Sequence, residues 1–401
     1  MHAPATASRL RVALVHDFLL DVRGAERVFL EMCELWPDAP IFTAIYDEEG
    51  TEGRFAHRDV HTSFLQRLRP TTRTFRPLLP LYPAAIESFE LHDFDLVVSS
   101  SSAWAHGVIV DDSAVHVCYS HNPFRYAWND RDRTLASRPD PLTRAALRSI
   151  FHRWRQWDWI AAQRVDQYLA NSRTTQGRIR AYFGRDSRVV HPPVETERFA
   201  PGTPGDHYLV LSELMPHKRI DVAVEAFNRL GLPLLVAGDG PEMRHLRSLA
   251  GPTVRLLGRV SDSEVAELLQ GARALVVTAV EEFGIAAVES QAAGRPVVAV
   301  SGGGLLETVR DGATGCFWEG GPDELAAAVR DFDVDAIDPS DCVSNAARFD
   351  GSVFRRVLPR EVERTLQRGG EERPARPGMP STRPGLGLTR RARAVERRPR
   401  G

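Results

Sequence analysis

The sequence predicts an α/β protein of two Rossmann-like domains that face each other across a cleft. Three observations predict this fold. Short β-branched runs alternate with longer segments of helical period, as in βαβ units and parallel sheets. The alternation restarts behind a Pro- and Gly-rich segment near residue 200. The 401 residues suffice for two or three domains of roughly 100 to 200 residues each.

The first predicted domain spans residues 1–200. Strand 11–15 opens it, and a turn at residues 23–25 leads into helix 26–36, which ends at Pro37 because proline cannot continue a helix. Further strands are expected at 41–46, 96–100, 115–120 and 168–170, and helices at 141–165 and 174–183. Ligands of open parallel sheets gather outside the carboxyl ends of the strands, so polar residues at those ends are the first site candidates.

The second predicted domain spans residues 206–340 and repeats this pattern. Its expected strands are 208–212, 234–237, 254–257, 274–278 and 296–300. Its expected helices are 219–230, 241–250, 262–272, 284–293, 305–309 and one that begins at Pro322. A helix within residues 350–368 is expected to return to the first domain. Residues 369–401 hold nine Arg and three Glu with few large apolar residues, so this tail is expected to be disordered.

Composition argues against several classes of protein. The formal net charge of -2 argues against a globally basic nucleic-acid-binding protein, and the basic tail makes the rest of the chain more acidic than this total. The four cysteines lie far apart without a C-x-x-C pair, so neither a zinc ribbon nor a disulfide framework is expected. No apolar run approaches the ~20 residues that span a bilayer, and the first residues lack a secretory signal. A soluble, cytoplasmic protein is therefore expected.

The most informative segment is EEFGIAAVE at residues 281–289, after the predicted strand 274–278. Gly284 begins a helix whose first N–H groups are free to bind a phosphate or a sugar hydroxyl. Glu281 lies in the loop before that helix, and Glu289 lies more than a turn into it, at ~1.5 Å rise per residue. The two carboxylates either meet different parts of one long polar ligand or are solvated surface charges.

Polar residues after three other strands favour the ligand interpretation. Lys218 and Arg219 follow one strand and open a helix, residues 239–242 (DGPE) end a second, and residues 302–304 (GGG) follow a third. Cations beside glycine-rich loops supply the charge-assisted donors and the close backbone approach that a diphosphate needs. A solvated helix face is the alternative for Lys218 and Arg219.

These residues resemble a known family. The stretches LSELMPHKRIDVAVEAF, LLVAGDGPE, LLGRVSD, EEFGIAAVESQAAGRPVVAV and GGGLLETVRDGATG are similar to the nucleotide-sugar half of the retaining glycosyltransferases of family 4 (group 1), which have the GT-B fold. In the first half, VALVHDFLLDVRGAERVFLEMCELWPDAPIFTAIYD, VCYSHNPFRYAW and ANSRTTQGRIRAYFGRDSRVVHPPVETERF resemble a bacterial polysaccharide branch that includes mannosyltransferase-like enzymes. The resemblance covers about residues 9–367, and only the motifs taken together are specific.

The resemblance implies roles for the second domain's motifs. Glu289 would bind the ribose hydroxyls of the nucleotide. The loop before it would hold the donor sugar through Glu281, its neighbour Glu282, and the backbone of Phe283, Gly284 and Ile285. Lys218, with Arg219 beside it, would meet the diphosphate and stabilise the leaving group. The family's transfer retains the anomeric configuration and uses no obligatory metal, so neither a metal nor a cofactor is expected.

The resemblance also covers the first domain, and two positions depart from it. His121 corresponds to the family's active-site histidine near the transferred sugar, with a histidine satisfied at a strand end as the alternative. Gly24 and Ala25 match the loop that approaches the donor phosphates and the acceptor. Glu213 stands where the family usually has Arg, which places a repulsive carboxylate near the diphosphate unless Arg219 substitutes for the missing cation. Ala287 stands where Pro is common, and alanine is a good helix former.

A basic and apolar segment lies between Thr62 and Ile86. It holds four arginines among leucines and phenylalanines without any acidic residue: Arg67, Arg69, Arg73 and Arg76. This segment either lies on an anionic membrane near a lipid-linked saccharide, or packs its leucines into the core with its arginines solvated. The FRYAW segment at residues 124–128 is either part of an acceptor-binding wall or core packing.

Together these observations predict a retaining glycosyltransferase that moves a hexose, with mannose as the candidate, from a nucleoside diphosphate sugar to a saccharide or lipid-linked acceptor in polysaccharide or glycoconjugate biosynthesis. A nucleotide-sugar epimerase on the same fold and a non-catalytic nucleotide-sugar-binding protein are the open alternatives. The D-x-D triplets do not end strands as metal-binding triplets of GT-A enzymes do, and GDGPEM lacks the third glycine of a dinucleotide fingerprint. The expected partners are the donor, the acceptor and an anionic membrane at the inner face of the cytoplasmic membrane, without nucleic acid.

Overall fold

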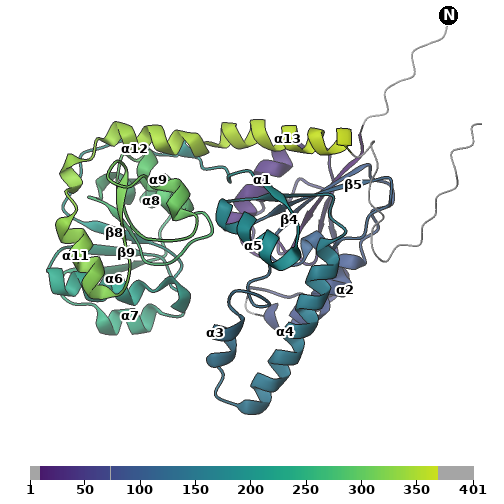
Figure 1. Ribbon diagram of the computed structural model, residues 1–401, viewed down its shortest axis with the longest axis horizontal. Coiled ribbons are helices and arrows are strands. Elements are labelled where there is room, and N and C mark those ends of the chain that lie inside the picture. The colour runs from purple at the N-terminus through teal and green to yellow at the C-terminus, as the bar shows by residue number, and fades with distance from the viewer. Residues whose placement is uncertain (1–9, 73, 369–401) are drawn as a thin grey trace, which may run out of the picture.

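The computed structural model describes residues 10–72 and 74–368, which form two α/β domains side by side (Figure 1). Each domain is built on one parallel sheet. The helices α12 (Pro339–Ala346) and α13 (Gly351–Arg368) run along one side of both domains. The predicted tail at residues 369–401 and Arg73 of the basic segment lie outside the described residues.

The first domain holds a seven-stranded sheet in the order β3-β2-β1-β4-β5-β6-β7, and every neighbouring pair is parallel. Its strands are β1 (Val12–His16), β2 (Ile41–Thr43), β3 (Val60–Thr62), β4 (Leu96–Ser101), β5 (Val115–Ser120), β6 (Gln167–Ala170) and β7 (Ser187–Val189). Strands β4 and β5 are buried at every residue, as expected for central strands of a parallel sheet covered on both faces. The strand order reverses between β1 and β4, where the loops part and leave a crevice.

The second domain repeats this topology with six parallel strands in the order β10-β9-β8-β11-β12-β13. They are β8 (Tyr208–Leu211), β9 (Leu234–Ala237), β10 (Val254–Gly258), β11 (Leu275–Val277), β12 (Val297–Val300) and β13 (Gly315–Trp318). Here the order reverses between β8 and β11. Two doubly wound parallel sheets are the architecture that the sequence predicts.

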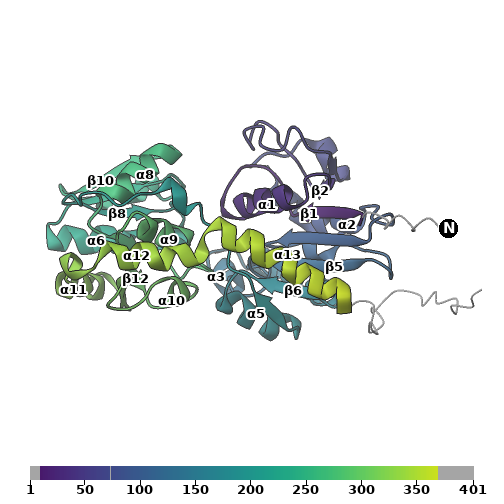
Figure 2. The ribbon, with the colours of Figure 1, turned by 90° about the horizontal axis from the view of Figure 1, so that it is seen from above.

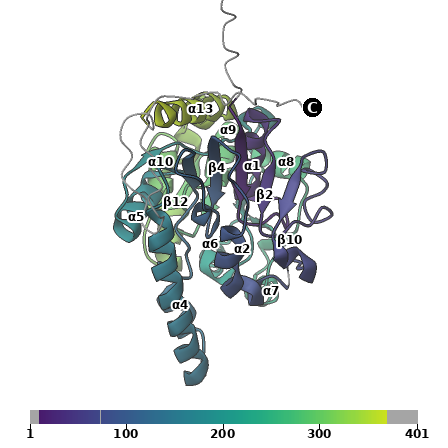
Figure 3. The ribbon, with the colours of Figure 1, turned by 90° about the vertical axis from the view of Figure 1, so that its right-hand side faces the viewer.

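Helices cover both sheets. In the first domain these are α1 (Gly24–Leu35), α2 (Tyr82–Glu87), α3 (Arg131–Ala136), α4 (Pro141–Ala162) and α5 (Arg173–Phe183), with short 3-10 helices η1 (Phe64–Leu68), η2 (Arg76–Leu81) and η3 (Ala105–Gly107). In the second they are η5 (Pro216–Lys218), α6 (Ile220–Leu230), α7 (Met243–Leu249), α8 (Asp262–Gly271), α9 (Ile285–Ala292), α10 (Leu305–Thr308) and α11 (Pro322–Asp331). Figure 3 shows α4 extending beyond the body of the molecule. None of the described helices is long and apolar enough to cross a membrane.

Helix α13 carries the chain from the second domain back to the first (Figure 2). Its buried Phe354, Leu358 and Val362 belong to the same apolar cluster as residues of β1, β4 and β5. The Phe354 ring meets the edge of Tyr119 on β5 at 5.7 Å between centroids. Apolar burial of this face therefore fastens the end of the described chain to the first domain.

The three strands that sequence patterns did not predict, β3, β7 and β13, all lie at sheet edges. The two in the first domain have partly or fully exposed side chains and only three residues each, so they lack a buried apolar run. The predicted strand 41–46 is continuous only as far as Thr43. Beyond it, Tyr46 forms an isolated parallel bridge with Leu19, and its backbone also bonds the amide side chain of Gln66. The short helices α2, α3 and α12 also carry too little periodicity to be predicted.

Asp17, directly after β1, ties that strand to the loop after β4. Its buried carboxylate accepts four backbone N–H bonds, from Ser102 and Ala103 at 2.6 and 3.0 Å and from Trp104 and Ala105 at 2.7 and 2.6 Å. Hydrogen bonds to an ionised acceptor are about twice as strong as neutral ones. The carboxylate therefore holds this loop beside the crevice of the first sheet.

We expect Asp17→Asn to destabilise the protein, because an amide presents two of its own donors to backbone N–H groups that need acceptors. Each buried polar group left unpaired costs about 1–3 kcal/mol, so the loss of unfolding free energy should exceed 2 kcal/mol, on the order of two such groups. The matched control is Asp93→Asn, whose side chain is 94% exposed. Urea unfolding followed by tryptophan fluorescence measures both variants, and equal stabilities would contradict the role given to Asp17.

Candidate functional site

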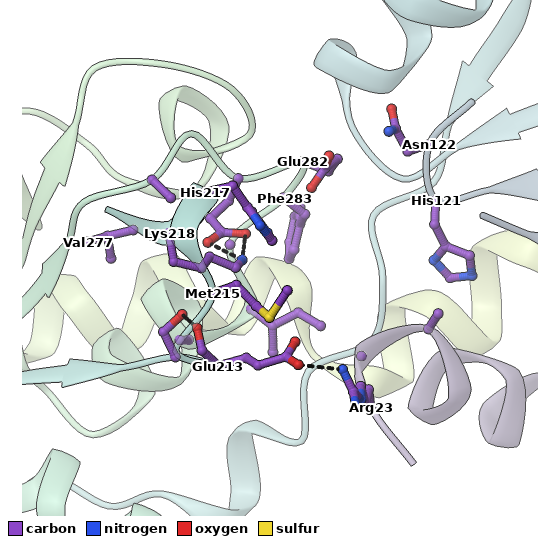
Figure 4. Close-up of a pocket in the computed structure, with 18 of the residues that line it drawn as sticks. Arg23, His121, Asn122, Glu213, Met215, His217, Lys218, Val277, Glu282 and Phe283 are labelled. Atoms are coloured by element: carbon purple, nitrogen blue, oxygen red, sulfur yellow. Dashed lines mark hydrogen bonds and ion pairs between the residues drawn. The ribbon is translucent and has the colours of Figure 1, made fainter. Parts of the chain in front are cut away.

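A cavity of about 620 Å³ lies between the two domains, outside the carboxyl ends of their strands (Figure 4). Loops that follow β1, β4 and β5 line one wall, and loops that follow β8 and β11 line the other. A second cavity of about 590 Å³ adjoins it and reaches Glu289 and the end of β9. The crevices of both sheets therefore open into one cleft, as expected for ligand sites of doubly wound sheets.

The first turns of α1 and α9 face each other across this cleft. Gly24 opens α1 and Ile285 opens α9, and a Cβ atom at Gly24 would lie 3.4 Å from Ile285 Cδ1. Gly284 has a φ of 91°, and a side chain there would also meet Leu305 at 2.7 Å, so this position requires glycine. The expected residues Gly24, Ala25, Gly284 and Ile285 all line the cavity. Two sets of free N–H groups favour an anionic ligand between the helices.

Lys218, labelled in Figure 4, forms an ion pair with Glu281 inside the cavity. The Lys218 Nζ donates to Glu281 Oε1 at 2.7 Å and to Oε2 at 2.8 Å. Thr278 Oγ1, after β11, donates to the backbone carbonyl of Lys218 at 2.6 Å and so fixes the turn that carries the lysine. The two side chains are only 21% and 22% exposed, so water screens this pair less than a surface pair. The structure thus brings these two predicted site residues into contact.

Arg219, predicted to bind the donor, points away from the cavity. Its backbone is left-handed, with a φ of 51°, at the start of α6. The guanidinium donates to the carbonyl of Gly320 at 3.1 Å, and the residue lines neither cavity. The reversed backbone direction therefore separates Arg219 from its neighbour Lys218, and Arg219 does not replace the cation missing at position 213.

Glu213 is paired, although the sequence predicted repulsion from a carboxylate at this position. Arg23 Nη1, from the first domain, donates to Glu213 Oε1 at 2.9 Å (Figure 4). Arg23 Nε donates to Asp21 Oδ2 at 2.5 Å. The positive charge opposite Glu213 thus comes from across the cleft, 190 residues away in the sequence.

Glu282, another predicted donor-binding residue, lines the cavity and links the two domains. Its Oε1 accepts hydrogen bonds from Arg125 Nη2 at 3.4 Å and from Arg178 Nη1 at 3.2 Å. Burial opposes ionisation of Glu282, but the two guanidinium groups outweigh burial and lower its pKa. Arg178 also donates to Asn122 Oδ1 at 2.8 Å. The carboxylate therefore stays ionised and held by the first domain.

His121, the predicted active-site histidine, directly follows β5 and lines the wall of the first domain. Its Nε2 lies 2.9 Å from Ser100 Oγ. Burial of the ring, aided by His16, lowers the pKa of His121 to about 3. The imidazole is therefore neutral near neutral pH, so it can exchange hydrogen bonds with hydroxyl groups but brings no positive charge.

Glu289 lies in the second cavity without a polar partner. Within the described part of the chain, its carboxylate makes no hydrogen bond or ion pair. Burial raises its pKa, an effect that the nearby Arg27 and Arg198 oppose. A half-buried carboxylate that faces a cavity and is unpaired in the protein favours hydroxyl donors from a ligand.

The glycines at 302–304 pack against the loop that carries Glu281 and do not reach the cavity. Gly304 N donates to the carbonyl of Glu281 at 2.8 Å, and a Cβ at Gly303 would lie 2.2 Å from that oxygen. None of the three lines either cavity. The sequence placed them with the phosphate-binding loops, but they instead hold the loop 281–284, whose buried Phe283 ring packs against Phe349 at 5.3 Å. Ala287, the other departure from the family pattern, is buried inside α9.

Several residues of the cavity wall were not predicted. Ser102, Asn122 and Asn171 line it and follow β4, β5 and β6 closely, so their place after a strand was the available signal. His217 also lines it, and burial together with Arg125 lowers the pKa of His217 to about 4. The FRYAW segment divides between the core and the cavity wall. Its phenylalanine and alanine are buried, whereas its arginine and tyrosine line the cavity.

Two family models match the chain. The model described as Glycosyl transferases group 1 matches residues 194–349. The model described as Glycosyltransferase Family 4 matches residues 22–198. Together they cover both sides of the cleft, from Gly24 to Glu289.

Curated relatives match part of the chain. The D-inositol 3-phosphate glycosyltransferase of Streptomyces scabiei is 31% identical over 205 residues, which is 42% of this chain and 46% of that relative. The enzyme of the same name from Geodermatophilus obscurus is 33% identical over 208 residues, with coverages of 41% and 45%. The chain thus spans about half the length of the curated relatives that it matches.

Solved structures share the architecture. HepE of Anabaena in complex with UDP-glucose superposes with a TM-score of 0.65 at 18% identity and covers 88% of this chain and 99% of that one. Sucrose-phosphate synthase of Thermosynechococcus elongatus gives a TM-score of 0.69 at 15% identity, with coverages of 90% and 100%. Likeness at these identities concerns the fold, and it confirms the predicted GT-B architecture.

Proposed function

The chain belongs to the group 1 glycosyltransferases, and we propose that it is a retaining enzyme that transfers a hexose from a nucleoside diphosphate sugar to a saccharide or lipid-linked acceptor. The observation that carries the proposal is a single cleft that holds the Lys218–Glu281 pair, two helix N-termini and the unpartnered Glu289. The UDP-glucose complex of HepE supports a sugar-nucleotide donor. Mannose is the hexose to test first, because the first half of the sequence resembles mannosyltransferase-like enzymes.

The donor would lie along the two adjoining cavities. Its nucleoside would occupy the cavity of Glu289, whose carboxylate would accept hydrogen bonds from the ribose hydroxyls. Its sugar would occupy the cavity of Glu281 and His121. The diphosphate would then lie between the first turns of α1 and α9, where free N–H groups and the helix dipoles stabilise negative charge.

The transfer breaks the bond between the sugar and the phosphate oxygen and forms one between the same sugar carbon and an acceptor oxygen. Negative charge develops on the departing diphosphate, and Lys218 stabilises that charge. Retention places the acceptor on the face from which the diphosphate leaves, so a phosphate oxygen takes the acceptor's proton. Glu281 and the neutral His121 would orient the sugar through its hydroxyls. Side chains and helix N-termini supply the charge stabilisation in this mechanism.

The acceptor side includes a surface suited to an anionic membrane, which we call the η1–η2 surface: Phe64, Arg67, Leu68, Arg69 and Leu81. These side chains are exposed, Leu68 to 62%, while Leu65 beside them is buried. Arg76 begins η2 and also lines the cavity. We propose that this surface rests on an anionic bilayer and brings the cavity to a lipid-linked acceptor at the inner face of the membrane.

The proposed reaction is tested by mixing the full chain with GDP-, UDP- and ADP-linked hexoses, with and without a bacterial lipid extract that contains lipid-linked saccharides. We expect free nucleoside diphosphate only when acceptor is present, and a product that keeps the donor's anomeric configuration by NMR. Isomerised nucleotide sugar without acceptor would instead identify an epimerase. Binding without turnover would identify a sugar-nucleotide-binding protein, and either result would overturn the proposal.

The roles of the ion pair are tested by Lys218→Ala and Glu281→Ala. Each should reduce kcat by roughly tenfold or more, because each removes one charged contact to the transition state. The matched control is Arg219→Ala, which removes a neighbouring cation whose guanidinium bonds Gly320 outside both cavities. It should keep kcat within about twofold of the unmodified enzyme. Normal turnover in both the lysine and the glutamate variant would refute this site assignment.

Membrane contact is tested by sedimentation with vesicles of phosphatidylglycerol and phosphatidylcholine. Leu68→Glu should reduce the bound fraction, because it places a negative charge and removes apolar area on the η1–η2 surface. Leu306→Glu is the control, since that side chain is also exposed, to 57%, but lies on the second domain. Pure phosphatidylcholine vesicles should bind little. Equal binding of the two variants, or no binding by the unmodified chain, counts against a membrane role.

A further inference from the structure

The two cavities of the cleft meet at a junction of seven residues that line both of them. Among these seven are Arg23, Gly24, Glu213 and Ile285. On one side lie Glu281 and His121, and on the other lies Glu289. In a nucleoside diphosphate sugar the diphosphate is the segment that connects nucleoside and sugar. A donor that fills both cavities, as the proposed function requires, must therefore pass its diphosphate through this junction.

The charged and polar groups at the junction have opposite effects on a diphosphate. The N–H groups of α1 and α9 and the guanidinium of Arg23 favour a diphosphate, whereas Glu213 repels one. Arg23 is held at two of its nitrogen atoms. Nη1 donates to Glu213 of the second domain at 2.9 Å, and Nε donates to Asp21 of the first domain at 2.5 Å.

These two contacts differ in how easily a ligand replaces them. The side chains of Arg23 and Glu213 are 55% and 42% exposed, and ion pairs with this much access to water contribute little stability. Asp21 is 28% exposed and lies two residues before Arg23 in the same turn, so that contact survives any shift of the domains. When Glu213 leaves, Asp21 still orients the guanidinium and Nη1 becomes free to donate.

We propose that Arg23 is a ligand of the donor diphosphate, and that the diphosphate displaces Glu213 from the Arg23 guanidinium. A phosphate oxygen then occupies the position of Glu213 Oε1 and accepts the Nη1 hydrogen bond. This inference rests on the proposed function and adds a diphosphate ligand to it. It also accounts for a carboxylate at position 213, because the cation that faces the diphosphate is supplied by the opposite domain.

The exchange predicts opposite effects for the two partners of one ion pair. Arg23→Gln removes a phosphate ligand and should weaken nucleoside diphosphate binding by roughly tenfold, as for the loss of a charge-assisted hydrogen bond. Glu213→Gln removes the competing carboxylate and should strengthen binding by roughly threefold or more, since a like charge nearby disfavours the anion. The double variant should bind more tightly than Arg23→Gln, because it also lacks the repelling carboxylate, but more weakly than Glu213→Gln, because it lacks the cation. Free nucleosides, which lack phosphates, should bind all variants alike.

The measurement is isothermal titration calorimetry of UDP, GDP and ADP with the full chain, with circular dichroism to confirm that each variant is folded. The control for the loss of a link between domains is Glu307→Gln. Glu307 Oε2 pairs with His191 Nε2 at 3.1 Å and lines neither cavity. This variant should leave nucleoside diphosphate affinity unchanged.

Each outcome decides the proposal. Opposite shifts for Arg23→Gln and Glu213→Gln support it. Shifts in the same direction would show that the pair acts only as a link between domains, and unchanged affinities would show that neither residue meets the diphosphate. Both results overturn the exchange while the proposed function stands. A folded, unmodified chain that binds none of the three nucleoside diphosphates overturns the exchange and the proposed function together.

Discussion

The meeting of two helix N-termini in one cleft is the constraint on which the rest of the site depends. Both sheets are parallel and doubly wound, so α1 and α9 begin outside the carboxyl ends of the strands. These ends of the two sheets face each other. Gly24 and Ile285 bring these two ends nearly into contact. The space between them is therefore electropositive before any charged side chain is considered.

Cations and carboxylates along the cleft are held in pairs of opposite charge, among them Lys218–Glu281, Arg23–Glu213 and Arg125–Glu282. Each pair keeps a long and flexible cation in one place, which reduces the conformational entropy that ligand binding must otherwise remove. Each carboxylate also competes with an anionic ligand for the same cation. The affinity for an anionic ligand is therefore set by how much more strongly each cation binds the ligand than it binds its carboxylate. Neutralising the carboxylate and neutralising the cation should consequently have different effects on that affinity.

Sequence patterns predicted the parts of this structure that burial determines. The limits of β5 were predicted because all of its residues are buried. The start of α9 was predicted at Gly284, one residue before the helix begins, because glycine suits that position. The short edge strands β3 and β7 were missed because exposure of their side chains removes the apolar pattern, whereas the edge strand β10 was predicted. Lys218 and Arg219 show most clearly what sequence patterns cannot predict. Because the backbone of Arg219 is left-handed, the side chains of these two neighbouring cations point in different directions. The pairing of Arg23 with Glu213 joins residues 190 positions apart and depends on how the domains face each other, which no local pattern contains.

The way in which the domains are joined limits what a ligand in the cleft can change. The chain crosses between them twice, and the two crossings are bonded to each other. Val194 N donates to Phe349 O at 2.9 Å, and Gly351 N donates to Val194 O at 3.1 Å. The bonded residues Val194 and 349–351 form a strip of backbone between the domains. A rotation of the domains must pivot about this strip, because separating the crossings would break its backbone hydrogen bonds. The links across the cleft are side-chain pairs that water or a ligand can replace. A ligand that exchanges them can therefore alter the angle between the domains while the strip and both sheets stay intact.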